Sequence, residues 1–375
     1  MRRWGGNATT RYNYRYDTSN RASDWFFENI AEDDADPSQL PDGSTADRFS
    51  GLDQETCGRT NCWSNPPDKE VRGGLPFTTW YLRQMKKYED EHGLRVLDYF
   101  DEHFYPQASG ISFGSGGDPA TDALRLRSTR ALWDPSYTDE SWIGTQVRLI
   151  PRMKELVAAE YPGTKTAITE YNWGALDHIN GALAQADILG LFGREGLDLA
   201  TLWGPPTASQ PGAYAFRMYL NYDGKGGRFG ETAVGAASAD QGKLAVYAAE
   251  RASDKALTLV VVNKTGDDLT SKVAVKGRDG GATAQVYRYG AADTSAVRRD
   301  ADVQVGAEGF TGTFPANSIS TVVIPAGAGP SPSPSPSPSA SPSPSPSPPP
   351  ARRPVPRPAR LRRPVPRRRR PPPAR

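Results

Sequence analysis

The chain has 375 residues, 10% of them aromatic, and a formal net charge of +2. Of its 45 Lys and Arg, 11 lie in residues 351–375, which hold none of the 43 Asp and Glu, so the rest of the chain has a net charge near −9. An acidic, aromatic-rich body repels phosphate, which argues against nucleic acid as its main ligand. The length is sufficient for two domains and tails.

The start of the chain and its cysteines bear on the cellular compartment. No stretch approaches the ~20 apolar residues of a membrane span, and Met1 leads into a polar segment without the apolar core of a signal peptide. The sequence therefore predicts either a cytosolic protein or one whose N-terminal segment is missing. Cys57 and Cys62 are candidates for a local disulfide if the protein is exported. The three histidines are scattered, so no metal site is predicted.

Residues 1–230 alternate between helical and buried-strand patterns. Helices are expected over 22–30, 75–91, 142–161 (with Pro151 bending or dividing it), 180–195 and 213–222, strands over 94–100, 165–169 and 197–203, and a loop over 51–74. Gly196 is expected to end the fourth helix. Strand–helix alternation with buried strands predicts a parallel α/β sheet or barrel.

The pattern changes in residues 231–326, where short, β-branched segments alternate with turns. Strands are expected over 244–251, 256–263, 271–275, 283–289 and 318–324, which predicts an antiparallel β-sandwich. Residues 327–350 repeat Pro-Ser and are expected to form an extended linker. Residues 351–375, rich in Arg and Pro, are expected to be disordered.

Three predicted strand ends carry residues suited to carbohydrate chemistry. Their side chains are His103 and Tyr105, then Glu170, Tyr171 and Trp173, and finally Trp203. Functional side chains of α/β barrels lie where the strands end. Aromatic faces stack on sugar rings, and a carboxylate among them can attack an anomeric carbon. Glu170 is therefore the residue most suited to chemistry, and the chemistry expected is cleavage of a polysaccharide.

A second candidate segment is Arg3-Trp4-Gly-Gly-Asn7, in which the glycines allow close backbone approach and Arg3 can stabilise a carboxylate. Structural interpretations stay open for each candidate. A glutamate at a strand end is often a salt-bridge or capping residue, and the Gly-Gly pair is often a simple turn. His103 is equally suited to support by hydrogen bonding, and Trp203 to barrel packing.

Several long segments together resemble glycoside hydrolase family 44, which comprises endoglucanases and xyloglucanases. The matching segments are 3–13, 17–30, 103–107, 132–143, 168–174 and 192–201, within a likeness that spans residues 2 to about 325. The resemblance implies a (β/α)8 barrel with a β-sandwich and a retaining mechanism that uses two glutamates. It implies that Glu170 is the nucleophile. It places Arg3 and Asn7 near Glu170, and His103, Tyr105, Tyr171 and Trp203 along the cleft.

The sequence also departs from the family pattern. The acid/base glutamate of the family lies in an Asn-Glu-Pro segment, and this chain contains no Asn-Glu dipeptide. A stretch of the family domain is expected to be deleted near residues 50–55, and the opening strand is expected to be absent before Met1. The fold class predicted is therefore α/β: an incomplete TIM-type barrel over 1–230, a β-sandwich over 231–326, and a disordered tail.

Three functions are compatible with this pattern. The first is a retaining hydrolase of internal β-1,4-glucan bonds that is impaired because its acid is missing. The second is a non-catalytic carbohydrate binder, and the third is an inert body with an anion-binding basic tail. The partners expected are a β-glucan and no membrane, with a monomeric, extracellular protein and no cofactor. The sequence leaves a structural calcium ion open.

Overall fold

The structure is a computed structural model that describes residues 75–278 and 280–326. Several predictions lie outside these residues: the helix over 22–30, the loop over 51–74, the roles of Arg3, Trp4 and Asn7, the Cys57–Cys62 disulfide, and the linker and tail.

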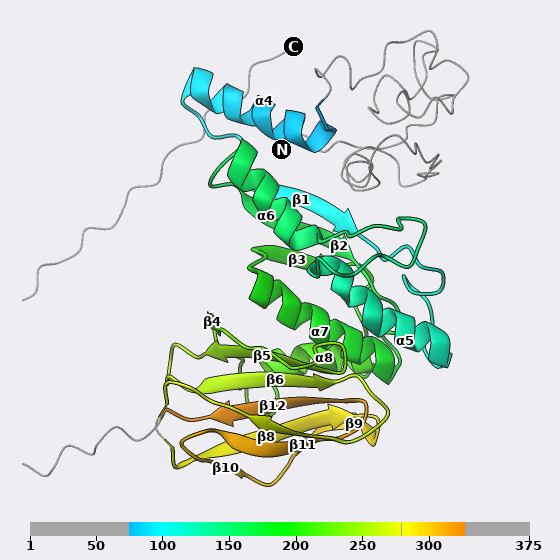
Figure 1. Cartoon of the computed structure of the whole chain (residues 1–375), viewed down its shortest axis with the longest axis vertical. Coiled ribbons are helices and arrows are strands. Elements are labelled where there is room, and N and C mark those ends of the chain that lie inside the picture. Colours follow the sequence, from blue (N-terminus) through cyan, green and yellow to red (C-terminus); the bar gives the residue numbers. More distant parts are fainter. Residues whose placement is uncertain (1–74, 279, 327–375) are drawn as a thin grey trace, which may run out of the picture. The chain divides into compact units, whose positions relative to one another are not determined.

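The first part of the described chain is a three-stranded parallel sheet with helices (Figure 1). The strands are β1 (Tyr99–Phe104), β2 (Lys165–Tyr171) and β3 (Leu199–Leu202), in the order β1-β2-β3. The helices are α4 (Phe77–His92), α5 (Pro119–Ser128), the 3-10 turn η3 (Thr129–Leu132), α6 (Leu149–Glu160), α7 (Ile179–Glu195) and α8 (Pro211–Leu220). The prediction of strand–helix alternation with parallel strands is confirmed.

Two predicted elements of this part lie elsewhere than expected. The first strand was expected over 94–100, but Leu94 and Val96 are 59% and 43% exposed and precede the strand, which begins at Tyr99. The helix expected over 142–161 begins only at Leu149. Pro151 is its third residue, in the first turn where no intrahelical N–H bond is lost, so the helix is neither bent nor divided there. The prediction that Gly196 ends α7 is confirmed by its φ of 68°.

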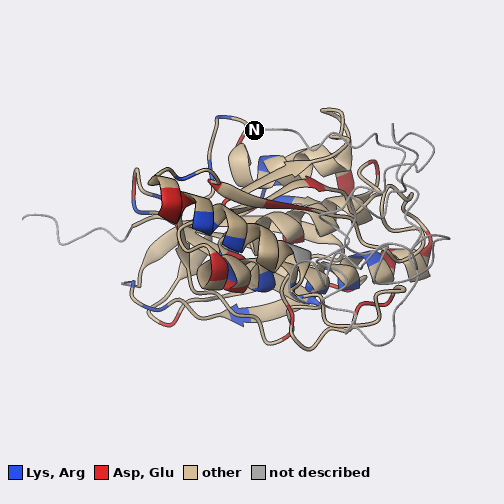
Figure 2. Cartoon of the chain, turned by 90° about the horizontal axis from the view of Figure 1, so that it is seen from above, with Lys and Arg blue, Asp and Glu red and all other residues tan. Residues whose placement is uncertain are grey.

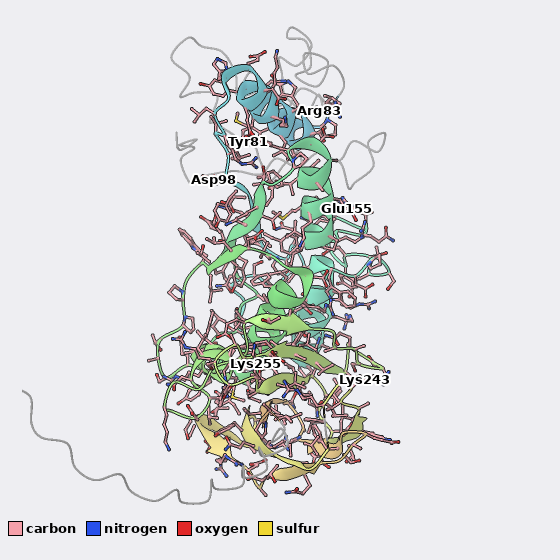
Figure 3. The ribbon with its side chains drawn as sticks, turned by 90° about the vertical axis from the view of Figure 1, so that its left-hand side faces the viewer. Tyr81, Arg83, Asp98, Glu155, Lys243 and Lys255 are labelled. Atoms are coloured by element: carbon pink, nitrogen blue, oxygen red, sulfur yellow. The ribbon has the colours of Figure 1, made fainter. Side chains whose placement is uncertain are left out.

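Helix α4 is joined to α6 by an ion pair at the surface. Arg83 of α4, which is labelled in Figure 3, donates from Nε and Nη2 to the carboxylate of Glu160, at 2.6 and 3.0 Å. Arg95 lies over the ring of Tyr161, 4.3 Å from its centroid. These contacts fix the position of α4 beside α6.

The second part consists of antiparallel strands. They are β4 (Thr232–Val234), β5 (Leu244–Glu250), β6 (Leu257–Asn263), β7 (Leu269–Val273), β8 (Ala282–Gly290), β9 (Asp293–Arg299), β10 (Val303–Val305), β11 (Phe310–Phe314) and β12 (Ser318–Ile324). Seven of them form one sheet in the order β10-β8-β12-β6-β5-β4, with β9 beside β8, and β11 pairs with β7. The five strands expected here are all present. β4, β9, β10 and β11 were not predicted.

Strands β6 and β12 are buried along their whole length. One set of their side chains, including Leu259 and Val322, packs with Phe310 and Phe314 of the small sheet. The other set, including Val260 and Ile319, belongs to the cluster that contains α7 and α8. One hydrophobic core therefore contains residues from both sides of residue 230, where the sequence analysis placed the boundary between the two domains. The position of that domain boundary stays a prediction.

No helix among the described residues is long and apolar enough to cross a bilayer.

Candidate functional site

A β-bulge in β2 sets the direction of the Glu170 side chain. In the pairing with β1, Glu102 lies opposite Ile168 and His103 lies opposite Glu170, so Thr169 is the extra residue. The pairing with β3 shifts register in the same place. Simple alternation would turn Thr169 and Glu170 to opposite faces. Because the bulge adds one residue, both side chains contact His103 on the same face.

Two side chains from the end of β1 contact one oxygen of the Glu170 carboxylate. Tyr105 Oη donates to Oε2 at 3.0 Å, and His103 Nδ1 lies 3.3 Å from the same atom. Among the described residues no hydrogen bond reaches Oε1. The Glu170 side chain is 29% exposed. The structure thus brings together three of the predicted site residues, with one carboxylate oxygen free to react.

Asp101 holds His103 in place through Thr169. The backbone N–H of Thr169 donates to Asp101 Oδ1 at 2.9 Å, and its hydroxyl donates to Oδ2. His103 Nε2 lies 3.2 Å from the same hydroxyl oxygen. Since the Thr169 proton is used on Asp101, the Thr169 oxygen is the acceptor in its contact with Nε2. Asp101, Thr169 and His103 thereby form one connected polar group beside Glu170.

Tyr171 and Trp173 do not line an open surface, contrary to the prediction. They are 2% and 1% exposed and pack against Phe104 and Phe192. The Tyr171 hydroxyl accepts a bond from Gln185, and burial raises the pKa of Tyr171 to about 12. Tyr171 is buried because side chains alternate again after the bulge, so that Tyr171 points to the face of the sheet opposite Glu170, where the helices pack.

Trp203 is exposed at the end of β3, as a sugar-stacking residue requires. Its side chain is 55% exposed. Its backbone is fixed, because its N–H donates to Tyr171 O at 3.1 Å and its carbonyl accepts from Asn172 Nδ2 at 2.7 Å. The packing interpretation of Trp203 is therefore not supported.

Two further exposed aromatic residues contact the segment that follows β1, and the sequence analysis did not assign them to the site. Phe113 is 58% exposed and lies against Tyr105, with ring centroids 5.2 Å apart. Its φ of 55° is unusual for an aromatic residue, and such outliers cluster at functional sites. Trp142 is 38% exposed and donates to Gln107 at 3.3 Å. Trp142 lies within the matching segment 132–143, and Phe113 follows the matching segment 103–107 by six residues.

A buried arginine fixes the loops that follow β1 and β2. All five N–H groups of Arg125 are used, on the carbonyls of Trp173, Gly110 and Ser115 and on the side chains of Asp122 and Asn180, at 2.7–3.0 Å. Its side chain is 0% exposed. Arg125 thereby ties the loop after Glu170 to the loop that carries Phe113.

We expect Arg125→Lys to lower the free energy of unfolding by about 2–3 kcal/mol, because an ammonium cannot reach all five acceptors and leaves buried carbonyls unpaired. Urea unfolding followed by circular dichroism measures this change. The matched control is Arg127→Lys, whose side chain is 46% exposed and for which a change within about 0.5 kcal/mol is expected. Equal effects of the two substitutions would contradict the role given to Arg125.

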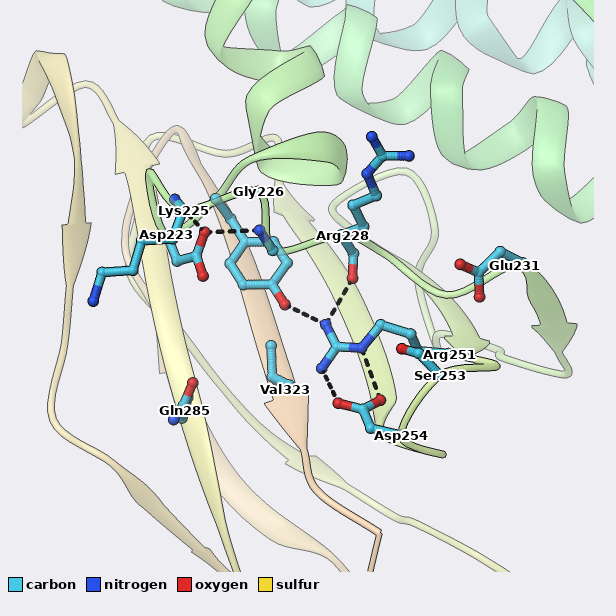
Figure 4. Close-up of a pocket in the computed structure, with 12 residues that line it drawn as sticks. Asp223, Lys225, Gly226, Arg228, Glu231, Arg251, Ser253, Asp254, Gln285 and Val323 are labelled. Atoms are coloured by element: carbon cyan, nitrogen blue, oxygen red, sulfur yellow. Dashed lines mark hydrogen bonds and ion pairs between the residues drawn. The ribbon is translucent and has the colours of Figure 1, made fainter. Parts of the chain in front are cut away.

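A polar hollow of about 410 Å³ lies apart from Glu170 (Figure 4). Its lining comes from residues 222–231 and 251–254, with Gln285 and Val323, and includes no residue of the parallel sheet. Arg251 in it is already paired, because it donates to both oxygens of Asp254 at 2.7 and 2.8 Å and to Tyr222 Oη at 2.7 Å. These contacts indicate a structural cluster that joins the end of α8 to the antiparallel sheet.

The charges of the described surface have no strong bias. Figure 2 shows Lys and Arg mixed with Asp and Glu over the helices and loops facing the viewer. Within residues 75–278 and 280–326, no group of three or more His, Cys, Asp or Glu side chains could hold a metal ion. The calcium ion that the sequence left open stays untested.

The chain is similar to several known proteins. A family model described as glycoside hydrolase family 44 matches residues 49–108. Endoglucanase A of Paenibacillus lautus is 35% identical over 260 residues, which are 67% of this chain and 37% of that protein.

Two solved structures are also similar. One is CelM2, a bifunctional glucanase-xylanase from a metagenome library, with 43% identity and a TM-score of 0.69 over 74% of this chain and 53% of that one. The other is a family 44 xyloglucanase from Paenibacillus polymyxa, solved with xyloglucan, with 31% identity and a TM-score of 0.64 over 71% of this chain and 54% of that one. The chain thus spans about half the length of these solved relatives.

Proposed function

We propose that this chain, which belongs to glycoside hydrolase family 44, carries the nucleophilic half of a retaining hydrolase of internal β-1,4-glucan bonds. The observation that supports this most directly is the bulge at Thr169, which places Glu170 on the same face as His103. The names of the similar proteins describe enzymes that act on glucans. Because one relative was solved with xyloglucan, xyloglucan is a candidate substrate.

Glu170 would act as the nucleophile through Oε1. The hydroxyl of Tyr105 donates to Oε2 at 3.0 Å and would hold the carboxylate in position for attack. Trp203, exposed at the next strand end, would hold a sugar ring by stacking. Arg3, Trp4 and Asn7 are further proposed contacts that lie outside the described residues.

No acid/base partner for this mechanism is found on the described strands of the parallel sheet. Retention needs a second carboxyl about 5–5.5 Å from the nucleophile. Glu102 is 2% exposed and lies with Phe100 and Phe104 on the buried face of β1, away from Glu170. Both oxygens of Asp101 accept hydrogen bonds from Thr169. We therefore expect impaired catalysis, by roughly 10²–10⁴-fold relative to an enzyme with its acid in place.

The finer architecture is part of the same proposal. The three parallel strands would be a portion of a (β/α)8 barrel, and the two antiparallel sheets would form the accompanying β-sandwich. A monomeric, extracellular protein follows from the same resemblance.

The test is hydrolysis of xyloglucan and carboxymethylcellulose by the purified chain. We expect weak or undetectable release of reducing ends, and better turnover of aryl glycosides, whose leaving groups need little help from an acid. Glu170→Gln should abolish all of it, whereas Glu308→Gln, at a side chain that is 84% exposed, should change nothing. Activity that survives Glu170→Gln would refute the assignment of the nucleophile.

A carbohydrate binder without turnover is the second candidate. It is favoured by two exposed aromatic side chains, Trp203 at the end of β3 and Phe113 in the loop after β1. Retention on a xyloglucan affinity gel without any product, weakened by Trp203→Ala, would support it.

A further inference from the structure

We infer that Asp101 and Thr201 are positioning residues, whose side chains hold the bulge at Thr169 from both sides and thereby fix the direction of the Glu170 carboxylate. The consequence for catalysis rests on the proposed role of Glu170 as nucleophile. The consequence for the direction of Glu170 does not, and it is measured separately below.

The bulge leaves Thr169 without a partner residue on the neighbouring described strands. In the pairing with β1 the partnered residues are Ile168 and then Glu170, and in the pairing with β3 they are Ile168 and then Tyr171. An extra residue in a strand lies outside the regular ladder, so its backbone N–H and C=O groups need other partners. The conformation of the bulge therefore depends on what binds these two groups.

Side chains from both neighbouring strands bind them. On β1, the Asp101 carboxylate accepts a hydrogen bond from the Thr169 N–H at 2.9 Å and another from the Thr169 hydroxyl. On β3, the Thr201 hydroxyl donates to the Thr169 carbonyl oxygen. The backbone of the extra residue is thus held between an acceptor on one side and a donor on the other.

The hold on Thr169 reaches the Glu170 carboxylate by two routes. Glu170 is the next residue, so the peptide between them transmits any rotation of the bulge. His103 also links the two, with Nε2 3.2 Å from Thr169 Oγ1 and Nδ1 3.3 Å from Glu170 Oε2. Regular alternation would place Thr169 and Glu170 on opposite faces of the sheet. A reacting group misplaced by about 1 Å can lose roughly 10²-fold in rate.

The two side chains serve no other visible purpose in the described part of the chain. Asp101 and Thr201 are exposed, and their hydrogen bonds within that part go to Thr169 alone. Replacing them therefore removes no core packing. A loss that follows such a replacement reports on the bulge, not on the stability of the hydrophobic core.

The experiment compares the full wild-type chain with Asp101→Ala, Thr201→Val and Thr201→Ser by crystallography and kinetics. Valine removes the hydroxyl without a change of charge, whereas serine keeps it. We expect the Glu170 carboxylate to leave Tyr105 and His103 in the crystal structures of Asp101→Ala and Thr201→Val, and to stay in place in Thr201→Ser.

The kinetic measurement uses 2,4-dinitrophenyl β-cellobioside, whose leaving group needs little help from an acid. In Asp101→Ala and Thr201→Val we expect kcat to fall by roughly 10²-fold while KM stays near the wild-type value, since the aromatic side chains expected to bind sugar are untouched. Thr201→Ser should keep most of the activity. The shape of the pH profile should not change in Thr201→Val, because no charge is removed.

The matched control is Thr321→Val. Thr321 of β12 donates from its hydroxyl to the carbonyl oxygen of Met218 on α8 at 2.8 Å, which is the same kind of bond away from the parallel sheet. This variant should unfold at a lower urea concentration but keep its kcat. Circular dichroism establishes that each variant is folded. An equal fall of kcat in Thr321→Val would overturn the inference, because the effect would then be general.

The two measurements separate the inference from the proposed function. If wild type is active and both Asp101→Ala and Thr201→Val keep its kcat, the inference fails and the proposed function stands. If folded wild type releases dinitrophenolate no faster than Glu170→Gln, the proposed function fails. The crystal structures then decide the inference alone, and an unmoved Glu170 in both variants would refute it.

Discussion

Replacing Asp187 with alanine is expected to lower the free energy of unfolding by about 3–5 kcal/mol, because it leaves a buried ammonium without a counter-charge. Asp187 lies on α7 and Lys264 follows β6, and their side chains are 2% and 3% exposed, with 2.7 Å between Nζ and Oδ2. Tyr247 donates to Oδ1 at 2.6 Å and Thr129 to Oδ2 at 2.7 Å. Three groups, from both parts of the described chain, thus meet at one carboxylate.

The titration of Tyr247 reports on the same cluster. Burial, followed by the negative charge of Asp187, raises the pKa of Tyr247 well above its usual value. The hydroxyl therefore stays protonated and remains a donor to Asp187 through the physiological range.

The test for this cluster is a double-mutant cycle in urea. Asp187→Leu should destabilise the protein for the same reason as alanine, and adding Lys264→Met should recover much of that loss, since a buried ion pair replaced by apolar groups is often neutral. Lys272→Met is the matched control, because Lys272 pairs with Glu308 at an exposed site, where both side chains are more than half exposed and little change is expected. Purely additive losses at Asp187 and Lys264 would contradict the coupling.

The elements that the sequence predicted well carry strong local signals. Helix α7 has a glycine at its end, and the central strands β6 and β12 are runs of β-branched residues. The missed strands lack such signals: β4 is three exposed residues, and β9 and β11 alternate with polar or glycine residues. Their pairing depends on partners distant in sequence, which no local pattern specifies.

The sequence predicted which residues form the candidate site, but not the directions in which their side chains point. The types of Glu170, His103 and Tyr105 were recognised at the strand ends, and they do meet. The bulge at Thr169 could not be predicted from the sequence, because it depends on the register in which β1 and β2 pair. The same register turned Tyr171 away from the site.

Replacing Glu102 with leucine is expected to stabilise the protein at pH 7 by about 2–4 kcal/mol. Both carboxylate oxygens of Glu102 are buried without a hydrogen-bond partner, beside Phe100 and Phe104 and opposite Ile168. Burial, with a smaller effect from the charge of Asp101, raises the pKa of Glu102 well above its usual value. The neutral acid is thus the form compatible with the fold.

The sign of the pH dependence follows from this direction. Below the pKa of an unfolded glutamate, about 4.3, both states hold the proton and Glu102 adds no dependence on pH. As pH rises above that value, the unfolded chain releases the proton and the folded chain keeps it. Stability then falls by about 1.4 kcal/mol per pH unit until the folded pKa is reached. Glu102→Leu should remove this slope, so its benefit should be larger at pH 7 than at pH 4.

Urea unfolding of Glu102→Leu and wild type at pH 4, 5.5 and 7 measures both effects. Glu308→Leu provides the matched control, since its exposed carboxylate should leave the slope unchanged. A benefit that is equal at all three pH values would show that Glu102 finds a partner when it ionises. A slope that is present in wild type and absent in Glu102→Leu, in contrast, would mean that this strand of the sheet gives up stability at neutral pH because a carboxyl occupies a core position between two phenylalanines. The cost would then come from the same alternation that keeps Glu102 away from Glu170.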